Sequence, residues 1–314
     1  MASQTIQKVA LAGASGLLGT PMLHALLNAG FDVTVLTRHS STATFPSTVS
    51  NVVRVDYENL NELRQALKGQ DALISTLTTF SISTQEKLID AAIAAGVKRF
   101  LPSEFGSDCS IKEVREMPMY KDKSEIDTYL RSRCEEQGVE MTWTAVYCSC
   151  FLDWGIDNNF YLNLKDKTCT LYDGGDFPTA TSPTDWVGEA VVGVLKHADE
   201  TRNREVKVSG IDISQRELLS IAQEVTGKEG WSATESTSQA AYEGAMEVFE
   251  KNRSNVWGWV MGMLVKGVFG EGCTRDFVGG KNDNGVLGLR QITREEVRGY
   301  FERAVRVGKS SKTF

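Results

Sequence analysis

The feature that most limits the fold of this chain is a glycine-rich segment at residues 13–19, Gly-Ala-Ser-Gly-Leu-Leu-Gly, which follows a short apolar run and precedes a helical stretch. Glycines allow a tight turn there, and they let backbone amides approach an anion at the N-terminus of the helix, where the helix dipole favours negative charge. In this strand–turn–helix context the spacing predicts a βαβ unit that binds the pyrophosphate of a dinucleotide. A tight turn that requires glycine but binds nothing is the alternative. The predicted cofactor contacts in this segment are Gly13, Ser15, Gly16, Leu17, Leu18 and Gly19.

Alternation of short strands and helical stretches continues through the first half of the chain, which is the pattern of βαβ units on a parallel sheet. We predict strands at 8–14, 32–37, 52–56, 72–77, 99–102 and 141–147. Helices are predicted at 17–28, 60–67, 85–95 and 119–136, with a capping box at 83–86 before the third of them. Glycines at positions 30, 69, 96 and 138 mark the left-handed turns that end helices. The expected fold class is therefore α/β, a Rossmann-type doubly wound parallel sheet.

The end of the second predicted strand decides between the two nicotinamide dinucleotides. NAD-binding proteins usually place Asp or Glu there, about 20 residues beyond the glycines, to bond the ribose 2′-hydroxyl. This chain has Arg38 instead. Because a guanidinium forms a planar, charge-assisted pair of hydrogen bonds with a phosphate, Arg38 predicts NADP(H) in place of NAD(H). Further cofactor contacts are predicted for Asp56 on the adenine side and for Ser75 and Thr76 beside the nicotinamide half.

Beyond residue 151 helices dominate. We predict them near 186–197, 215–225, 239–251 and 295–305, with a short strand near 206–209 and capping boxes at 214–217 and 293–296. Five of the six tryptophans lie past residue 150, which suits a domain that closes over a flat organic substrate; an aromatic core is the alternative. We therefore predict an NADP(H)-binding Rossmann domain at 1–152, onto which 183–210 packs back, and a smaller, mostly helical substrate-binding domain at 153–314.

Composition and charge argue against several kinds of partner. The formal net charge is −7 and no basic stripe is present, so nucleic acid, which requires Lys and Arg to displace counterions, is not expected. No apolar run reaches the roughly 18 residues that a membrane span needs, and the polar N-terminus does not resemble a signal peptide, so we expect a cytoplasmic protein. Cys148 and Cys150 would point to opposite faces of a strand, so we expect buried free thiols and no metal site. The sequence does not decide whether the chain forms a homodimer.

Several motifs together resemble one known family. They are Leu-Pro-Ser-Glu-Phe-Gly at 101–106 with the Gly-Val-Lys-Arg-Phe that precedes it, the glycine-rich segment, and Pro-Thr-Asp-Trp-Val-Gly-Glu-Ala at 183–190. Across residues 5–210 the chain resembles the isoflavone reductase-like, NmrA-like proteins, which are atypical short-chain dehydrogenases. The resemblance implies an NADPH-binding parallel sheet, a lysine near the nicotinamide, and reduction of small aromatic secondary metabolites. Ser103 and Phe105 join the predicted cofactor contacts.

The resemblance places the family's lysine on the helix that follows residues 101–106, where Lys123 matches its position and Lys121 is the alternative. An ammonium there would stabilise the negative charge that hydride transfer builds on a substrate oxygen, and it could supply the proton. The Tyr-x-x-x-Lys pair of ordinary short-chain dehydrogenases is missing from this helix. Tyr161 and Lys165 have that spacing but follow the sixth predicted strand.

These observations predict an NADPH-dependent reductase that transfers a hydride to a small aromatic or conjugated secondary metabolite. Two alternatives stay open: an NADP(H)-binding redox sensor that acts through protein partners without turnover, and a non-redox enzyme on the same fold. Lys123 favours the reductase, because a sensor needs no proton donor.

Overall fold

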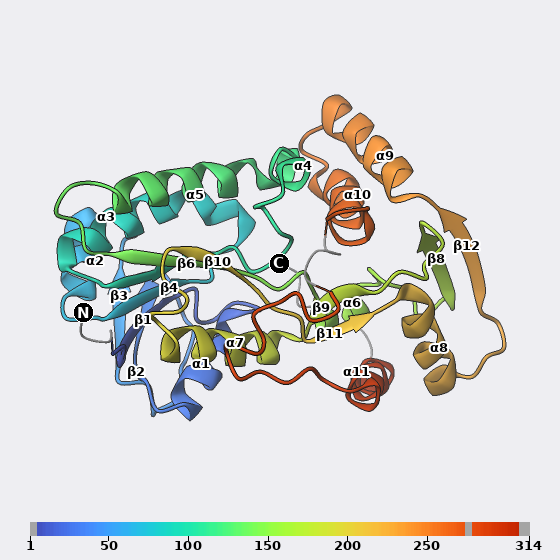
Figure 1. The fold of residues 1–314 in the computed structure, drawn as a ribbon, viewed down its shortest axis with the longest axis horizontal. Coiled ribbons are helices and arrows are strands. Elements are labelled where there is room, and N and C mark those ends of the chain that lie inside the picture. The colour runs from blue at the N-terminus through green and yellow to red at the C-terminus, as the bar shows by residue number, and fades with distance from the viewer. Residues whose placement is uncertain (1–4, 274–277, 308–314) are drawn as a thin grey trace.

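A computed structural model describes residues 5–273 and 278–307. Its largest sheet has seven strands and lies at the left in Figure 1. The strands lie in the order β10-β6-β5-β4-β1-β2-β3, and every pair in this sheet is parallel. Their bounds are β1 Lys8–Ala12, β2 Asp32–Arg38, β3 Asn51–Val55, β4 Ala72–Ser75, β5 Arg99–Leu101, β6 Thr142–Tyr147 and β10 Arg204–Lys207. The predicted Rossmann-type parallel sheet is confirmed.

Strand β1 lies at the point where the winding of the sheet reverses. Val9 on β1 is paired with Val33 on β2 and with Ala72 on β4, so the chain passes from β1 to β2 on one side and returns to β4 on the other. In open parallel sheets the carboxyl ends of the strands leave a crevice at such a point, and ligands bind there. The glycine-rich segment leaves β1 at this edge.

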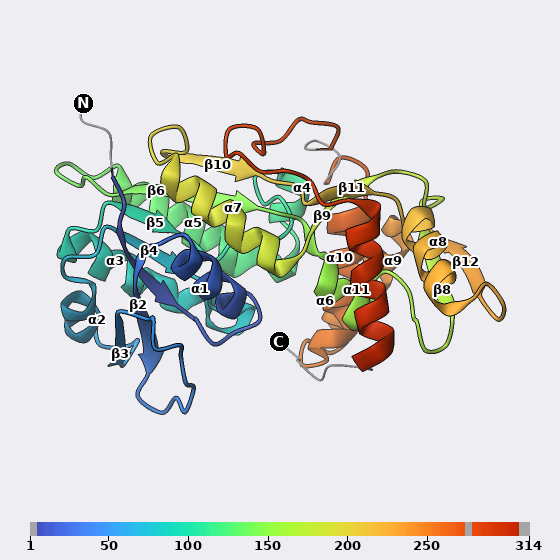
Figure 2. The ribbon, with the colours of Figure 1, turned by 90° about the horizontal axis from the view of Figure 1, so that it is seen from below.

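Helices cover both faces of the sheet. Because successive side chains of a strand point to opposite faces, Val9 and Leu11 pack with α1 and α7, whereas Ala10 and Ala12 belong to the core under α2, α3 and α5. Figure 2 shows the face that α1 and α7 cover. The helix bounds are α1 Gly19–Asn28, α2 Leu60–Leu67, α3 Gln85–Ala95, α5 Lys121–Cys134 and α7 Thr184–Lys196.

The second half of the chain adds smaller sheets and helices beside the carboxyl edge of the main sheet (Figure 1). A three-stranded sheet has the order β11-β9-β7, and a two-stranded sheet pairs β12 with β8. The strands are β7 Cys150–Phe151, β8 Thr168–Tyr172, β9 Thr179–Ser182, β11 Ile211–Ile213 and β12 Ser232–Ser236. The helices are α6 Leu152–Asp157, α8 Gln215–Thr226, α9 Ser238–Lys251, α10 Val256–Phe269 and α11 Arg294–Val307. Shorter turns precede α5, namely α4 Lys112–Arg115 and η2 Pro118–Tyr120.

Helices α9 and α10 form a hairpin that is anchored by aromatic contacts. The Phe249 ring on α9 meets the Trp259 ring on α10 edge-on, with 5.2 Å between centroids. At the other end of α10, the ring of Phe269 stacks on Phe160 at 5.6 Å and on Tyr172 at 5.7 Å. These contacts hold α10 against the rest of the second half of the chain.

Several expectations from the sequence were wrong in detail. No capping box forms at 83–86: the 3₁₀ helix η1 (Thr79–Thr84) leads straight into α3, so Thr84 is already helical and makes no side-chain cap. Helix 119–136 is divided into η2 and α5, and α10 was not predicted at all. The capping box at Ser214–Glu217 is confirmed, as is the one at 293–296, where Glu296 N donates to Thr293 Oγ1 at 3.2 Å.

The stretch 183–210 returns to the main sheet. Within it, α7 packs against α1, and β10 extends the main sheet by pairing with β6, with Val206 opposite Val146. The division into domains at 1–152 and 153–314 stays a prediction.

Candidate functional site

The glycine-rich segment is shaped by close contacts between β1, β4 and α1. Gly13 has φ +86°, and a Cβ there would lie 2.7 Å from the carbonyl oxygen of Thr76. A Cβ on Gly19 would lie only 2.0 Å from the carbonyl oxygen of Gly13. At Gly16 the nearest atom to an added Cβ is the Gly13 oxygen at 3.2 Å. Packing therefore demands glycine at 13 and 19, whereas a Cβ at 16 would make this one tight contact and would otherwise face open space.

That open space is a groove of about 710 Å³ at the carboxyl ends of β1 to β4. Gly13, Ser15 and Gly16 line one part of it, and Arg38 and Asp56 line another. The turn after Arg38 is fixed by Arg54, whose Nη1 donates to the Ser41 carbonyl oxygen at 2.6 Å. The groove is also lined by Phe45, Tyr57, Thr76 and Thr78.

The predicted cofactor contacts fall into two groups, those that line the groove and those that do not. Gly13, Ser15, Gly16, Arg38, Asp56 and Thr76 line the groove. Leu17, Leu18, Gly19, Ser75, Ser103 and Phe105 are not part of its lining. The Ser103 hydroxyl donates to the Leu77 carbonyl oxygen at 2.8 Å, and Ser75 is fully buried. The roles of all twelve as cofactor contacts stay predictions.

A second, mainly apolar pocket of about 450 Å³ adjoins the groove, since Thr78 lines both. Its walls come from the loop after β5, from η2 and the start of α5, from the corner between β6 and β7, from α6 and from α10. Its aromatic side chains are Phe105, Tyr120, Phe151, Trp154, Trp257 and Trp259. A flat aromatic molecule fits such walls.

Lys123 brings a cation into this pocket. It is half-buried, and its Nζ donates to the carbonyl oxygen of Glu104 at 2.5 Å. Lys121 is exposed and lies 3.6 Å from Glu125, so its ammonium faces solvent. Positions two apart on a helix point in different directions, and here it is Lys123 that lines the pocket.

The side chain of Glu104 is buried behind Lys123. Burial raises the pKa of this carboxyl to about 7, with the Lys123 ammonium acting against the rise. Its Oε2 has no hydrogen-bond partner in the described part of the chain. Burial also holds the pKa of the neighbouring Cys109 thiol well above its usual value.

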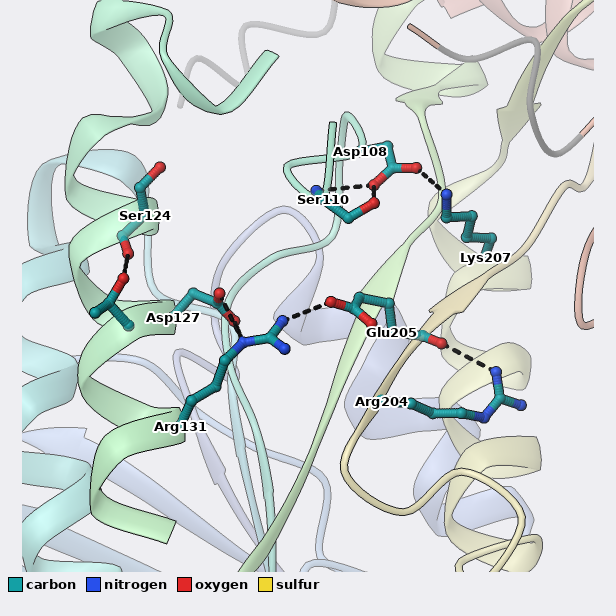
Figure 3. Close-up of polar contacts among 9 residues, drawn as sticks. Asp108, Ser110, Ser124, Asp127, Arg131, Arg204, Glu205 and Lys207 are labelled. Atoms are coloured by element: carbon teal, nitrogen blue, oxygen red, sulfur yellow. Dashed lines mark hydrogen bonds and ion pairs between the residues drawn. The ribbon is translucent and has the colours of Figure 1, made fainter. Parts of the chain in front are cut away.

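Two ion pairs hold α5 and the loop after β5 against strand β10 (Figure 3). Arg131, two turns beyond Lys123, bonds Asp127 at 2.8 Å and Glu205 at 2.6 Å. Lys207 lies 2.5 Å from the buried Asp108. Burial, the largest single influence, would raise the pKa of Glu205, but the hydrogen bond from Arg131, a backbone hydrogen bond and the charges of Arg131 and Lys207 together lower it. These contacts fix the segments that carry Lys123 and Phe105.

Sequence reasoning missed several residues of the pocket. Of the five tryptophans past residue 150, Trp154, Trp257 and Trp259 line the pocket, whereas Trp186 and Trp231 do not. Ser149 also lines the pocket, and no sequence signal pointed to it. Its position depends on a backbone conformation that residue type does not reveal.

The six cysteines are free, and five of them are buried, as expected. In residues 5–273 and 278–307 no group of three or more His, Cys, Asp or Glu is placed to hold a metal ion. Across the same residues, no helix has the length and apolar character to cross a membrane.

Comparison with known proteins agrees with this architecture. Residues 5–231 match the model of the NmrA-like family, and the chain therefore belongs to that family. It is 32% identical to oxidoreductase poxI of Penicillium oxalicum over 92% of each chain. It is 38% identical to oxidoreductase aprR of Aspergillus flavus over 78% of this chain and 82% of the relative.

A likeness to solved structures supports the fold. Leucoanthocyanidin reductase from Vitis vinifera, solved as a ternary complex, superposes with a TM-score of 0.75 at 22% identity and covers 94% of this chain and 99% of its own. Its binary complex with NADPH superposes with a TM-score of 0.71 at 21% identity over the same shares of the two chains. At these identities the likeness shows the fold alone.

Proposed function

We propose that this protein is an NADPH-dependent reductase that transfers a hydride to a small aromatic or conjugated secondary metabolite. The observation that carries the proposal is the half-buried Lys123 ammonium in an aromatic pocket that adjoins the groove at Thr78. The names of the relatives, two oxidoreductases and a reductase, support the reaction class.

The groove has the residues that NADP(H) requires. A Cβ at Gly16 would meet only the Gly13 carbonyl oxygen, so an anion can approach the backbone there, and residues 13–16 would hold the pyrophosphate. Arg38 is exposed at the groove and would bind the 2′-phosphate. Asp56 would contact the adenine side and Thr76 the nicotinamide half. The structural neighbour was solved with NADPH bound, which supports NADP(H) as the cofactor.

When bound, NADPH supplies the hydride that adds to a carbon of the substrate. The electron pair of the acceptor's double bond then moves to oxygen, and the Lys123 ammonium stabilises the charge and donates a proton to that oxygen. The aromatic side chains exclude water, which strengthens the electrostatic interaction between the ammonium and the oxygen.

Steady-state oxidation of NADPH across a panel of phenolics and enones tests the proposal. Turnover of at least one conjugated aromatic member is expected. Tight NADPH binding by calorimetry without turnover of any member would contradict the reductase and favour the redox sensor. Absence of NADPH binding would contradict both and favour a non-redox enzyme.

Two further expectations belong with this proposal. The sequence does not decide whether the protein forms a homodimer, and sedimentation would measure its oligomeric state. The cytoplasmic location is expected from composition, and cell fractionation would test it.

A further inference from the structure

Ser149 has an unusual backbone conformation for its surroundings. It forms the corner between β6 and β7 and has φ +57°, in the left-handed region that a serine rarely occupies. The other non-glycine residues with positive φ, Asn159, Lys167, Asp173 and Asn203, are at least partly accessible, whereas Ser149 is 1% exposed. A buried residue held in this conformation often belongs to a functional site.

The contacts of Ser149 fix its backbone and leave its side chain available. Its amide donates to the Gly106 carbonyl oxygen at 3.0 Å, which locks the corner onto the loop after β5. Its buried Oγ has no hydrogen-bond partner in the described part of the chain, although Ser149 lines the apolar pocket. Because a buried hydroxyl without a partner is costly, this one is suited to a ligand atom that the pocket receives.

Ser149 and Lys123 are both next to Gly106. A Cβ built on Gly106 would lie 3.9 Å from Lys123 Nζ, and the Gly106 carbonyl accepts the Ser149 amide. Burial raises the pKa of the Cys148 thiol, and the Lys123 ammonium is close enough to act against that rise. The ammonium and the free hydroxyl therefore flank one short segment of the pocket wall.

The other polar side chains that line the pocket differ in what they offer: Asp122 is a carboxylate, which accepts and does not donate, and Thr78 lies where the pocket meets the groove. Ser107 Oγ accepts a hydrogen bond from the Tyr120 hydroxyl at 2.8 Å, and the side chains that α10 contributes to the pocket are apolar: Val256, Trp257, Trp259, Val260, Leu264 and Val268. A substrate oxygen that lies against the Gly106 segment would thus meet two hydrogen-bond donors, Lys123 and Ser149.

We propose that Ser149 is a catalytic residue whose Oγ donates a second hydrogen bond to the substrate oxygen that Lys123 protonates. This inference rests on the proposed reductase function. As the substrate's carbon accepts the hydride, its C–O double bond gives up an electron pair to oxygen; Ser149 Oγ stabilises that oxygen, and the proton comes from Lys123 Nζ. The substrate class is a conjugated carbonyl or quinone-methide-like aromatic, whose oxygen lies between the two donors.

Two substitutions distinguish the role of the Ser149 hydroxyl from the role of its backbone conformation. Ser149→Ala removes the hydroxyl and leaves a side chain that is equally strained at positive φ, whereas Ser149→Gly removes both the hydroxyl and the strain. On a substrate that the native protein reduces, we expect kcat to fall about 10²-fold in both variants, the usual loss for one donor to a developing oxyanion. The affinity for NADPH, measured by calorimetry, should change less than two-fold.

Other outcomes would overturn the proposal. A glycine variant with native kcat would show that only the corner's conformation matters, and weaker NADPH binding would show that Ser149 contacts the cofactor. If the native protein reduces no panel member, the reductase function fails, and the role of Ser149 is then tested by ligand binding. Ser149→Ala should weaken the binding of an aromatic ketone but not that of the matched hydrocarbon. Equal weakening of the two, or no binding of the ketone by the native protein, would overturn the inference for Ser149.

Discussion

Arg38 is the residue on which cofactor choice depends. It ends β2 at the rim of the groove, and within the described chain its guanidinium forms no hydrogen bond or ion pair. Arg38→Ala should weaken NADPH binding by about 1.5–3 kcal/mol, the contribution of a charged hydrogen bond, and leave NADH binding unchanged. Calorimetric titration of both cofactors measures this difference. Equal affinities of the native protein for NADPH and NADH would contradict the assignment.

A substitution at Gly16 tests cofactor binding apart from the packing of the glycine-rich segment. A Cβ on Gly16 would make one tight contact, 3.2 Å from the Gly13 carbonyl oxygen, whereas a Cβ on Gly19 would lie only 2.0 Å from that oxygen. Gly16→Val should therefore leave the chain folded but abolish NADPH binding, because its side chain would fill the approach to the backbone amides. The matched variant Gly19→Val should instead unfold the protein. Circular dichroism and titration distinguish the two, and a folded Gly16→Val protein with native NADPH affinity would show that the segment is only a turn.

Lys123 is expected to act on the substrate and not on the cofactor. Lys123→Ala should reduce kcat by about 10²–10⁴, the usual contribution of one general acid, while the Kd for NADPH stays within a few-fold. Lys121→Ala is the control on the same helix, because its ammonium is exposed beside Glu125. Loss of activity in Lys121→Ala, or full activity in both variants, would contradict the assignment.

At the scale of elements, the position of α5 depends on the contact of Arg131 with Glu205 on β10. The folded protein lowers the pKa of Glu205, so this contact adds stability above the ordinary value of 4.5 and loses it as the pH falls through the lower, folded-state value. Glu205→Gln should lower the free energy of unfolding by about 1–2 kcal/mol at pH 7, and the difference from the native protein should shrink below about pH 4.5.

Urea denaturation at several pH values measures that difference. Glu125→Gln on the same helix is the control: its pair with Lys121 is exposed, so its effect should stay below about 0.5 kcal/mol at pH 7. A difference for Glu205→Gln that does not change with pH would contradict the interpretation, because it would not come from the charge of the carboxyl.

Elements with a local signal could be predicted from the sequence, and those without one could not. The main strands are apolar runs, and the groove residues Gly13, Gly16 and Arg38 lie at or shortly after strand ends, so their placement needs only local chain geometry. Helix α10 was missed because its sequence, VWGWVMGMLVKGVF, is apolar all round and contains three glycines. Strand pleating placed Ser75 out of the groove although its neighbour Thr76 lines it. The position of Ser149 in the pocket wall depends on a tertiary contact with Gly106, and no local sequence pattern encodes that contact.

At the scale of the whole molecule, both predicted domains contribute side chains to the same hydrophobic clusters. A single cluster of buried side chains runs from Ile6 and Val9 through Trp154 to Val297 and Phe301. Elements with a continuous core are expected to unfold together, so the division at residue 152 should not appear as separate unfolding steps.

Differential scanning calorimetry with and without NADPH tests this expectation. One transition should appear, and NADPH at one hundred times its Kd should stabilise the whole chain by about 2.7 kcal/mol and shift that entire transition upward. NADH at the same concentration should shift it less, because it lacks the phosphate that Arg38 would bind. Two transitions, of which NADPH moves only one, would contradict the shared core and support domains that unfold separately. In that case the groove would be stabilised alone, and the pocket around Lys123 could open while NADPH stays bound.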